Sequence, residues 1–296
     1  MNQLPDSISL VMRSYNEAWA IGDTLKAVFD QDYPGKIELI VIDSASTDGS
    51  HEIIRQFDPY AFEILEPGTY VPGVVLNRGM QLATNEWVVY LNSDATPANR
   101  QWLSELLKVA LATPNLGSAF SRQIPRGDCQ AVFAHDYDRC FGPNRESVNW
   151  PNFFSMVSCI TSKTIWREFP FREDLQYAED DEWSRRMKDG GREIVLAEKS
   201  IAIHSHNYTL AQSYKRARGD AVAVSKAGHA NPVGNKPKFL VMGTVKDALA
   251  DFKFCQREGR LGEWPHAIGV RWQQRRGRAD GYDAGAAERT ANQQPS

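Results

Sequence analysis

Three short polar segments follow directly after apolar runs and hold the residue types best suited to binding and catalysis. They cover residues 13–17, 43–50 and 92–97. Any one of them is typical of a turn or a helix start, because Asp, Ser and Asn side chains bond free backbone amides there. All three are predicted at the same edge of one sheet, which isolated turns would not require. We therefore expect a ligand site at that edge.

The elements that must position these segments alternate between strand and helix over the first 120 residues. Strands are predicted at 8–12, 37–42, 62–65 and 87–91, and helices at 21–29, 51–57, 77–83 and 102–112. Such alternation predicts an α/β fold with a mostly parallel sheet and helices on both faces. Ligands of these sheets bind beyond the carboxyl ends of the strands.

The second half of the chain is less regular. Residues 123–151 are rich in Asp, Arg, Asn and Pro, so we expect a mobile loop there. Helices are predicted at 181–188, 210–229 and 239–257, and strands at 193–196 and 200–204. After Gly277 few apolar residues remain, which predicts a disordered end.

The composition is that of a folded protein, because 42% of the 296 residues are apolar and 10% are aromatic. No run of about 18 apolar residues occurs, so we expect no membrane-spanning helix. The first nine residues contain no signal core, and the four cysteines form no CxxC pair. These features predict a cytoplasmic protein without disulfides. No GxGxxG follows the first strand and no GxxxxGK[ST] occurs, which argues against dinucleotide and P-loop phosphate sites.

Positive charge is concentrated near the C-terminus. Residues 234–278 hold ten Lys or Arg against four Asp or Glu, although the net charge of the chain is −3. Aromatic and aliphatic residues alternate with these cations, so the segment suits the surface of an anionic membrane. A homodimer contact or a solvated helical face explains the pattern equally well. We expect no nucleic-acid partner.

Together, the three polar segments resemble the nucleotide half of the family 2 glycosyltransferases, whose GT-A fold is Rossmann-like. The run EDDEWSRR at 179–186 is similar to the family's ED motif, and HSHNYT at 204–209 is similar to a sequence common in its rhamnosyltransferase branch. The resemblance covers about residues 7–220. It implies a GT-A domain over 1–233, with a nucleotide half to about 122 and an acceptor half at 123–233. The composition adds a basic helical extension at 234–278 and a disordered tail at 279–296.

The resemblance also implies a nucleotide site. Asp43 matches the family's pyrimidine-recognising Asp, and its carboxylate can accept the imide N–H of uracil or thymine. We expect this carboxylate to be exposed on its loop. The other residues expected at the nucleotide are Ser14, Tyr15, Asn16, Glu17, Arg78 and Ser93.

A divalent metal ion is implied as cofactor. Asp94 matches the last Asp of the family's DXD metal motif, whereas Asn92 replaces the first. One carboxylate holds a divalent cation weakly, so a second side chain is needed. His204 is the best candidate, and an imidazole favours Mn²⁺ somewhat over Mg²⁺. His206 has a weaker claim and is expected toward the acceptor.

Asp180 is the predicted general base, which accepts the proton of the acceptor hydroxyl in an inverting displacement. Glu179 is the next candidate. These acids also open a helix, where carboxylates cap free amides and complement the dipole, and Asp181 or Glu182 can fill that role. Trp183 is expected either in the core or as a platform for the acceptor.

The expected activity is metal-dependent transfer of a sugar to a saccharide or lipid-linked acceptor, with rhamnose from dTDP-rhamnose as the first choice. A UDP-hexose donor is the nearest alternative. A sugar nucleotidyltransferase is disfavoured, because residues 13–17 contain no Gly for a phosphate loop. Asn92 lends some support to a catalytically inactive binding domain, which the candidate acids and His204 together oppose.

Overall fold

The computed structural model describes residues 3–293, which form two compact units. The first unit comprises the described residues of Met1–Ile124 together with Trp150–Leu175 and Glu179–His204. The second comprises Pro125–Asn149, Gln176–Ala178 and the described residues from Ser205 onward. The domain boundaries implied by the resemblance, near residues 122 and 233, stay predictions.

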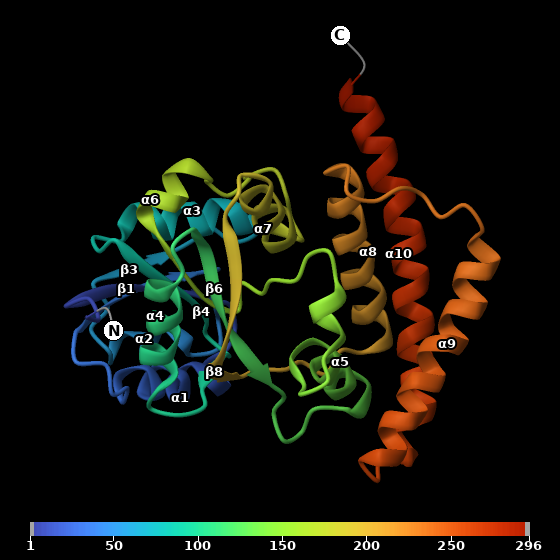
Figure 1. Ribbon diagram of the computed structural model, residues 1–296, viewed down its shortest axis with the longest axis horizontal. Coiled ribbons are helices and arrows are strands. Elements are labelled where there is room, and N and C mark those ends of the chain that lie inside the picture. The colour runs from blue at the N-terminus through green and yellow to red at the C-terminus, as the bar shows by residue number, and fades with distance from the viewer. Residues whose placement is uncertain (1–2, 294–296) are drawn as a thin grey trace. The chain divides into compact units, whose positions relative to one another are not determined.

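A single mixed sheet forms the centre of the first unit (Figure 1). Its strands are β1 (Ser7–Ser14), β2 (Lys36–Asp43), β3 (Ala61–Ile64), β4 (Trp87–Asn92), β5 (Thr96–Pro97), β6 (Leu116–Ile124), β7 (Ser158–Ser162) and β8 (Glu193–Ile203). They lie in the order β3-β2-β1-β4-β7-β6-β8-β5. The first four strands pair in parallel, as do β6 and β8, whereas β7 runs antiparallel to β4 and β6. The predicted mostly parallel α/β sheet is confirmed.

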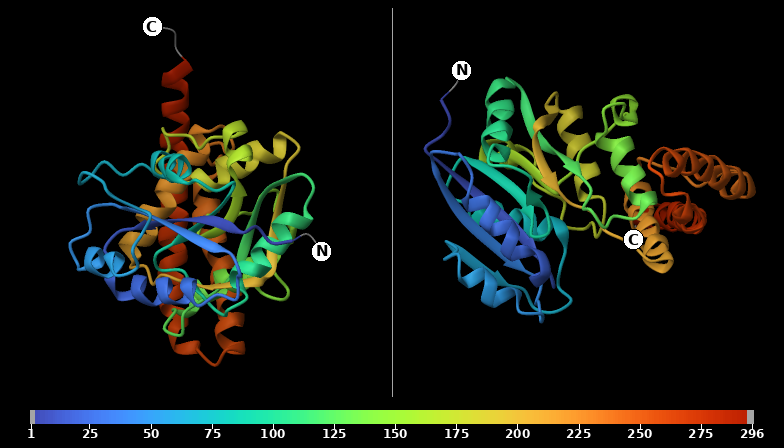
Figure 2. Two further views of the ribbon diagram at one scale, coloured as in Figure 1. Left: turned by 90° about the vertical axis from the view of Figure 1, so that its left-hand side faces the viewer. Right: turned by 90° about the horizontal axis from the view of Figure 1, so that it is seen from below.

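Helices cover both faces of this sheet, as the two views in Figure 2 show. They are α1 (Ala18–Phe29), α2 (Ser50–Arg55), α3 (Pro72–Leu82), α4 (Trp102–Ala112), α6 (Lys163–Glu168) and α7 (Glu179–Asp189). Side chains of β1 alternate between the faces: Leu10 and Met12 join the core cluster that holds the apolar residues of α1 and α4. Val11 points to the opposite face, where a Cβ on Gly79 of α3 would lie 2.4 Å from its Cγ1. Gly79 therefore permits the close approach of α3 to β1.

The predicted strands at 193–196 and 200–204 are one strand, β8. Its register with β6 passes from Ser121↔Ala197 to Arg122↔Ile201, so one step along β6 corresponds to four along β8. The extra residues form a bulge that contains the exposed Glu198 and Lys199. The sequence suggests a break there because these two charged residues interrupt the apolar pattern, but the strand continues beyond them.

The second unit is helical. Its helices are α5 (Ala131–Phe141), α8 (Leu210–Lys226), α9 (Lys236–Arg257) and α10 (Trp264–Gln293), with short 3-10 turns at Glu146–Asn149 and Leu261–Glu263. The expectation of a mobile loop over 123–151 is wrong for α5, because Val132 and Phe133 pack in a small core with Phe254 and Cys255 of α9. No helix within residues 3–293 is both long enough and apolar enough to cross a bilayer.

Helix α10 overturns the expected disorder after Gly277. It lies against α8 (Figure 1), and its glycines at 277, 281 and 285 face α8 at every fourth residue. A Cβ on Gly281 would lie 2.4 Å from the carbonyl oxygen of Arg218 and 2.7 Å from Cβ of Ala221. Contact between two backbones, rather than between large apolar side chains, thus holds this helix, and composition does not reveal it. Residues 294–296 of the predicted tail lie outside the described residues.

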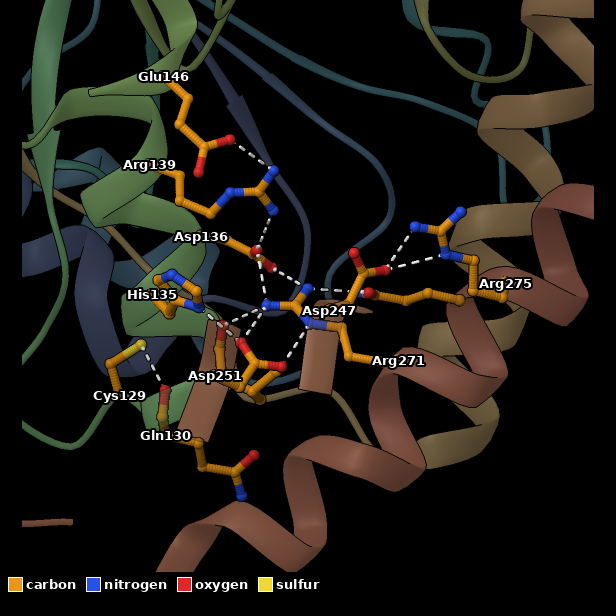
Figure 3. Close-up of polar contacts among 12 residues, drawn as sticks. Cys129, Gln130, His135, Asp136, Arg139, Glu146, Asp247, Asp251, Arg271 and Arg275 are labelled. Carbon is orange, nitrogen blue, oxygen red and sulfur yellow. Dashed lines mark hydrogen bonds and ion pairs between the residues drawn. The ribbon is translucent and has the colours of Figure 1, made fainter. Parts of the chain in front are cut away.

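Paired buried charges join α5, α9 and α10 (Figure 3). The Arg271 guanidinium donates to Asp251 through Nε and Nη2, both at 2.8 Å, and to Asp136 at 3.0 Å through Nη1. His135 Nδ1 lies 2.6 Å from Asp251 Oδ1. Burial raises the pKa of Asp251, but hydrogen bonds from Arg271 and His135 lower it further, so the pKa lies below its ordinary value. Part of the positive charge of residues 234–278 is therefore neutralised inside this unit.

Candidate functional site

The three polar segments meet at the carboxyl ends of neighbouring parallel strands. The register places Ser14 of β1 beside Asp43 of β2, and Arg13 of β1 beside Asn92 of β4. Hydrogen bonds join the first two segments: Asn16 donates its backbone N–H to Ser46 Oγ at 2.8 Å, and its Oδ1 accepts from Thr47 N at 2.9 Å. The strand-edge position expected from the sequence is therefore present in the structure.

Backbone strain is concentrated around these segments. Four non-glycine residues among those described have a positive φ, and Asn16 (52°), Ala45 (63°) and Ala178 (56°) are three of them. Asn tolerates this conformation, but Ala does so at a cost of about 1–3 kcal/mol that the surrounding structure must offset. Ala45 lies inside the second segment and Ala178 directly precedes the acidic start of α7. Strain of this kind accumulates at binding sites and catalytic sites.

Asp43 is fully buried, which corrects the expectation of an exposed loop carboxylate. Its Oδ1 accepts from Ser46 N at 2.7 Å and lies 2.8 Å from His51 Nε2, while its Oδ2 accepts from Ser46 Oγ at 2.7 Å. A carboxylate offers about four lone-pair sites, so one remains for a ligand. The same bonds support the strained Ala45 turn, and Asp43 is thus a structural group of this segment.

By contrast, Ser14 Oγ is buried and has no hydrogen-bond partner within the described residues.

Glu17 of the first segment lies against Ser93 and Asp94 of the third. Ser93 donates its hydroxyl to Glu17, which lies just beyond β1. Burial raises the pKa of Glu17 to about 7, and the nearby carboxylate of Asp94 adds to the shift. Tyr15, in the first segment, remains exposed. Near neutral pH Glu17 is therefore partly protonated, which reduces the negative charge beside Asp94.

His204 lies beside Asp94 although 110 residues separate them in the sequence. The two-residue strand β5 follows Asp94 and pairs antiparallel with β8 at Thr96↔Ile203, which delivers His204 to the same edge. Both side chains are buried, and His204 Nε2 lies 3.5 Å from Asp94 Oδ2. Two ligands of one metal ion, each about 2.1 Å from it, need such a separation. The short β5 cannot be predicted from periodicity, because two residues carry none.

Gln123, which the sequence analysis did not select, fixes the orientation of His204. Its Oε1 lies 3.2 Å from His204 Nδ1, and its Nε2 donates to Ser155 Oγ at 2.7 Å. Because an amide oxygen only accepts, this contact favours a proton on His204 Nδ1 and leaves Nε2 as the nitrogen that can ligate a metal ion beside Asp94. Metal-ligating histidines are typically held by such a partner. The donor set of a carboxylate and an oriented imidazole therefore fits a divalent ion.

The acids at the start of α7 divide into separate roles. Glu179 pairs with Arg13 at 3.0 Å, Asp181 with Arg185 at 2.8 Å, and Glu182 with Arg186 at 2.9 Å. Three of the four acids are thus held by arginines. The fourth, Asp180, accepts from the backbone N–H of Asp181 at 2.8 Å.

Arg13 opens the first polar segment, but the sequence analysis gave it no role of its own. Its guanidinium bonds Glu179 at 3.0 Å, Asn92 Oδ1 at 3.1 Å and the hydroxyl of Tyr70 at 3.2 Å. Asn92, which replaces the first Asp of the DXD motif, therefore serves as an acceptor for Arg13. Arg13 also lies close enough to Asp180 for that carboxylate to favour its charged form. One buried cation thus connects β1, the third segment and the start of α7.

Comparison with known proteins identifies the family. Residues 9–162, just over half of the chain, match the profile described as Glycosyl transferase family 2. The chain belongs to the family 2 glycosyltransferases. This glycosyltransferase is 28% identical over 209 residues to the glycosyltransferase AglE of Haloferax volcanii and 25% identical over 221 residues to the O-antigen chain rhamnosyltransferase WbaN of Salmonella anatum. The aligned parts cover 67% and 71% of this chain, and 66% and 70% of the two relatives, so the match spans about two thirds of their length.

Solved structures support the GT-A fold of this glycosyltransferase. The mannosyltransferase PcManGT of Pyrobaculum calidifontis superposes with a TM-score of 0.61 at 20% identity, over 97% of this chain and 88% of that one. The glucosyl-3-phosphoglycerate synthase of Mycobacterium tuberculosis gives a TM-score of 0.56 at 19% identity, over 76% and 80% of the two chains. The expected family, fold and enzyme class are therefore confirmed.

Three further residues selected from the sequence are Trp183, Arg78 and His206. Trp183 of the glycosyltransferase has no exposed surface and donates its indole N–H to Phe169 O at 2.7 Å, so it is a core residue and not a platform for the acceptor. Arg78 pairs with Glu63 on the surface, and its nucleotide role stays a prediction. His206 belongs to the second unit, where its ring stacks on Tyr208.

Proposed function

We propose that this glycosyltransferase moves a sugar from a nucleotide-sugar donor to a saccharide or lipid-linked acceptor with inversion at the anomeric carbon, and that its first donor is dTDP-rhamnose. The observation that carries the proposal is the Asp94–His204 pair, with 3.5 Å between Oδ2 and Nε2, at the edge where β1, β2 and β4 end. Nucleotide ligands of parallel sheets bind beyond these ends. Ser14, Asn16, Glu17, Ser93 and Tyr15 lie on the segments there and would line the nucleotide.

Asp94 and His204 would hold a divalent metal ion, Mn²⁺ in preference to Mg²⁺. An oriented imidazole together with a carboxylate suits Mn²⁺, and diphosphate oxygens of the donor would complete the ligand set. When bound, the ion would offset negative charge on the departing diphosphate. The fold relatives agree with this assignment: PcManGT is described in complex with GDP-Man and Mn²⁺, and the mycobacterial synthase with Mn²⁺ and UDP.

Asp180 would take the proton from the acceptor hydroxyl. The role rests on the position of Asp180 in the run that resembles the ED motif of the family, where Glu179, Asp181 and Glu182 each form an ion pair with an arginine. Glu179, the second candidate from the sequence, would instead position Arg13. Asp180 then acts as general base while its neighbours stabilise the start of α7.

The preference for rhamnose rests on the relatives. WbaN and RfbN, at 25% and 23% identity over about 70% of each chain, are both named O-antigen chain rhamnosyltransferases. The second candidate is the same reaction with a UDP-hexose, which the UDP complex of the mycobacterial synthase supports. For either donor the residues named above keep the same roles.

The proposal is tested by measuring nucleoside diphosphate release from dTDP-rhamnose, UDP-glucose, UDP-GlcNAc and GDP-mannose, with Mn²⁺ and with a chelator. We expect release from dTDP-rhamnose that requires the metal and is lost in Asp94→Asn. The matched control is Asp23→Asn, which makes the same change at an exposed position on α1 and should leave release unchanged. Release from a UDP-sugar alone would replace the first donor by the second. No release from any donor, with or without acceptor, would contradict the proposed activity.

A further inference from the structure

Helix α9 presents an apolar stripe to solvent. Val241, Met242, Val245 and Leu249 keep 54%, 61%, 49% and 55% of their surface exposed. Their spacing of one, four and eight residues places them on one face over about two turns. The opposite face is buried and includes Thr244, Ala248 and Cys255. A folded helix that exposes four large aliphatic side chains in one stripe is a surface for a partner.

We propose that this stripe of α9 rests on the surface of an anionic lipid bilayer. Three exposed lysines accompany the stripe. At 100° per residue around the helix axis, Lys238 lies within the stripe, and Lys246 and Lys253 lie along one edge of it. An aliphatic face with flanking lysines suits a helix lying in the headgroup region, where the side chains insert and the ammonium groups meet lipid phosphates.

The acids of α9 do not reach this face. Asp247 pairs with Arg275 at 2.7 Å, and Asp251 pairs with Arg271 in the buried network of Figure 3. The remaining charged residues of α9 itself on the exposed arc are therefore all cationic, and Glu146 of the 3-10 turn, which lies near Lys246, is paired with Arg139 at 2.9 Å. Among the basic residues of 234–278, Arg271 and Arg275 thus form internal ion pairs, whereas Lys238, Lys246 and Lys253 face outward as one row. The membrane contact expected from the sequence is therefore limited to one face of α9.

A second copy of the chain fits this face less well. Two copies joined through α9 would set lysine rows against each other without a carboxylate between them, which is unfavourable. Four aliphatic side chains of one helix are also far fewer than the roughly 20–30 residues a side of a stable interface. A bilayer fits this face better, because anionic headgroups supply negative charge for the lysines and the headgroup region accepts a shallow apolar stripe.

The test is co-sedimentation of the full-length protein with vesicles of mixed phosphatidylglycerol and phosphatidylcholine, compared with phosphatidylcholine alone. We expect binding to the anionic vesicles only, weakened by salt. Replacing Lys238, Lys246 and Lys253 by Glu should weaken binding on the order of 100-fold, since each lysine near the surface contributes about fivefold. The matched control reverses Lys26, Lys108 and Lys199, exposed lysines of the first unit, and should bind as the unchanged protein does.

Two serine variants test the apolar part. Met242→Ser with Leu249→Ser should weaken binding at least about tenfold, because two buried aliphatic side chains are lost. Tyr60→Ser with Val148→Ser makes a similar change at other exposed sites, 62% and 65% exposed, and should have no effect. The proposal is overturned by absence of binding to anionic vesicles at low salt, or by a dimer in sedimentation velocity that the Met242 and Leu249 changes dissolve. Release of nucleoside diphosphate from donor in solution should be equal in all these variants, so this test and the test of the activity can fail separately.

Discussion

Replacement of Arg13 by Met should destabilise the first unit and slow the reaction. The change keeps most of the side-chain volume but removes the guanidinium that bonds Glu179, Asn92 and Tyr70. Removing one partner of a buried ion pair costs about 3–5 kcal/mol. Arg13 and Glu179 keep 15% and 13% of their side-chain surface, so we expect about 2–4 kcal/mol in the free energy of unfolding. Urea denaturation measures this loss.

A matched control separates the burial of Arg13 from its charge. Arg78→Met removes the same group from an exposed pair with Glu63, and should cost no more than about 1 kcal/mol. Arg13→Met combined with Glu179→Gln should recover part of the loss, because no unpaired carboxylate then remains. At a temperature where both variants are folded, turnover of Arg13→Met should fall about 10–100-fold, as it does when a residue that holds another functional group in place is removed. Equal stability losses in Arg13→Met and Arg78→Met would refute this reasoning.

Three further substitutions test other parts of the structure. Asp43→Asn should lower both donor affinity in calorimetry and the free energy of unfolding, the latter by about 1–3 kcal/mol, because the amide NH2 that replaces Oδ2 cannot accept the hydroxyl of Ser46; an unchanged melting temperature would contradict the buried role. Arg271→Leu should cost about 3–5 kcal/mol at neutral pH, since Asp251 stays buried and charged. The folded-state pKa of Asp251 is depressed, so its contribution to the free energy of unfolding is present above about pH 4 and is lost as the pH falls through the folded pKa. In urea titrations at acid pH, the variant and the unchanged protein should therefore approach the same stability. Gly281→Ala should lower the melting temperature, with a cost of about 1–3 kcal/mol from overpacking against α8, whereas Gly262→Ala, which meets no atom within 4 Å, should be neutral.

The strand-edge segments could be predicted because they depend on local pattern. An apolar run that ends in Asp, Ser or Asn predicts a strand end, and parallel pairing then brings Ser14 and Asp43 together without further information. The family resemblance adds Asp94, Asp180 and His204 as candidates. These features are encoded within a few residues of each position.

The rest of the site depends on contacts between distant residues. The approach of His204 to Asp94 requires the two-residue strand β5, and the orientation of its ring requires Gln123. Arg13 acquires its three partners from β4, α7 and the segment before α3. No short window of sequence contains such pairings.

The same limit explains the errors in the second unit. Helix α5 is stable because Phe133 packs against α9 and Asp136 pairs with Arg271, which is 135 residues away. Helix α10 persists to residue 293 because glycines bring its backbone against α8. Polar or glycine-rich composition predicts disorder only when no such partner exists.

We propose that Asp180 accepts the proton of the acceptor hydroxyl, and the turnover of Asp180→Asn tests this proposal directly. Asn keeps the size of the side chain and an acceptor for Asp181 N, but it cannot take the proton. We expect turnover to fall about 10²–10⁴-fold, with donor affinity and melting temperature little changed. Asp181→Asn, which alters a neighbouring carboxylate held by Arg185, should retain most activity. An Asp180→Asn enzyme that melts normally and transfers sugar at nearly the original rate would exclude Asp180 as the general base.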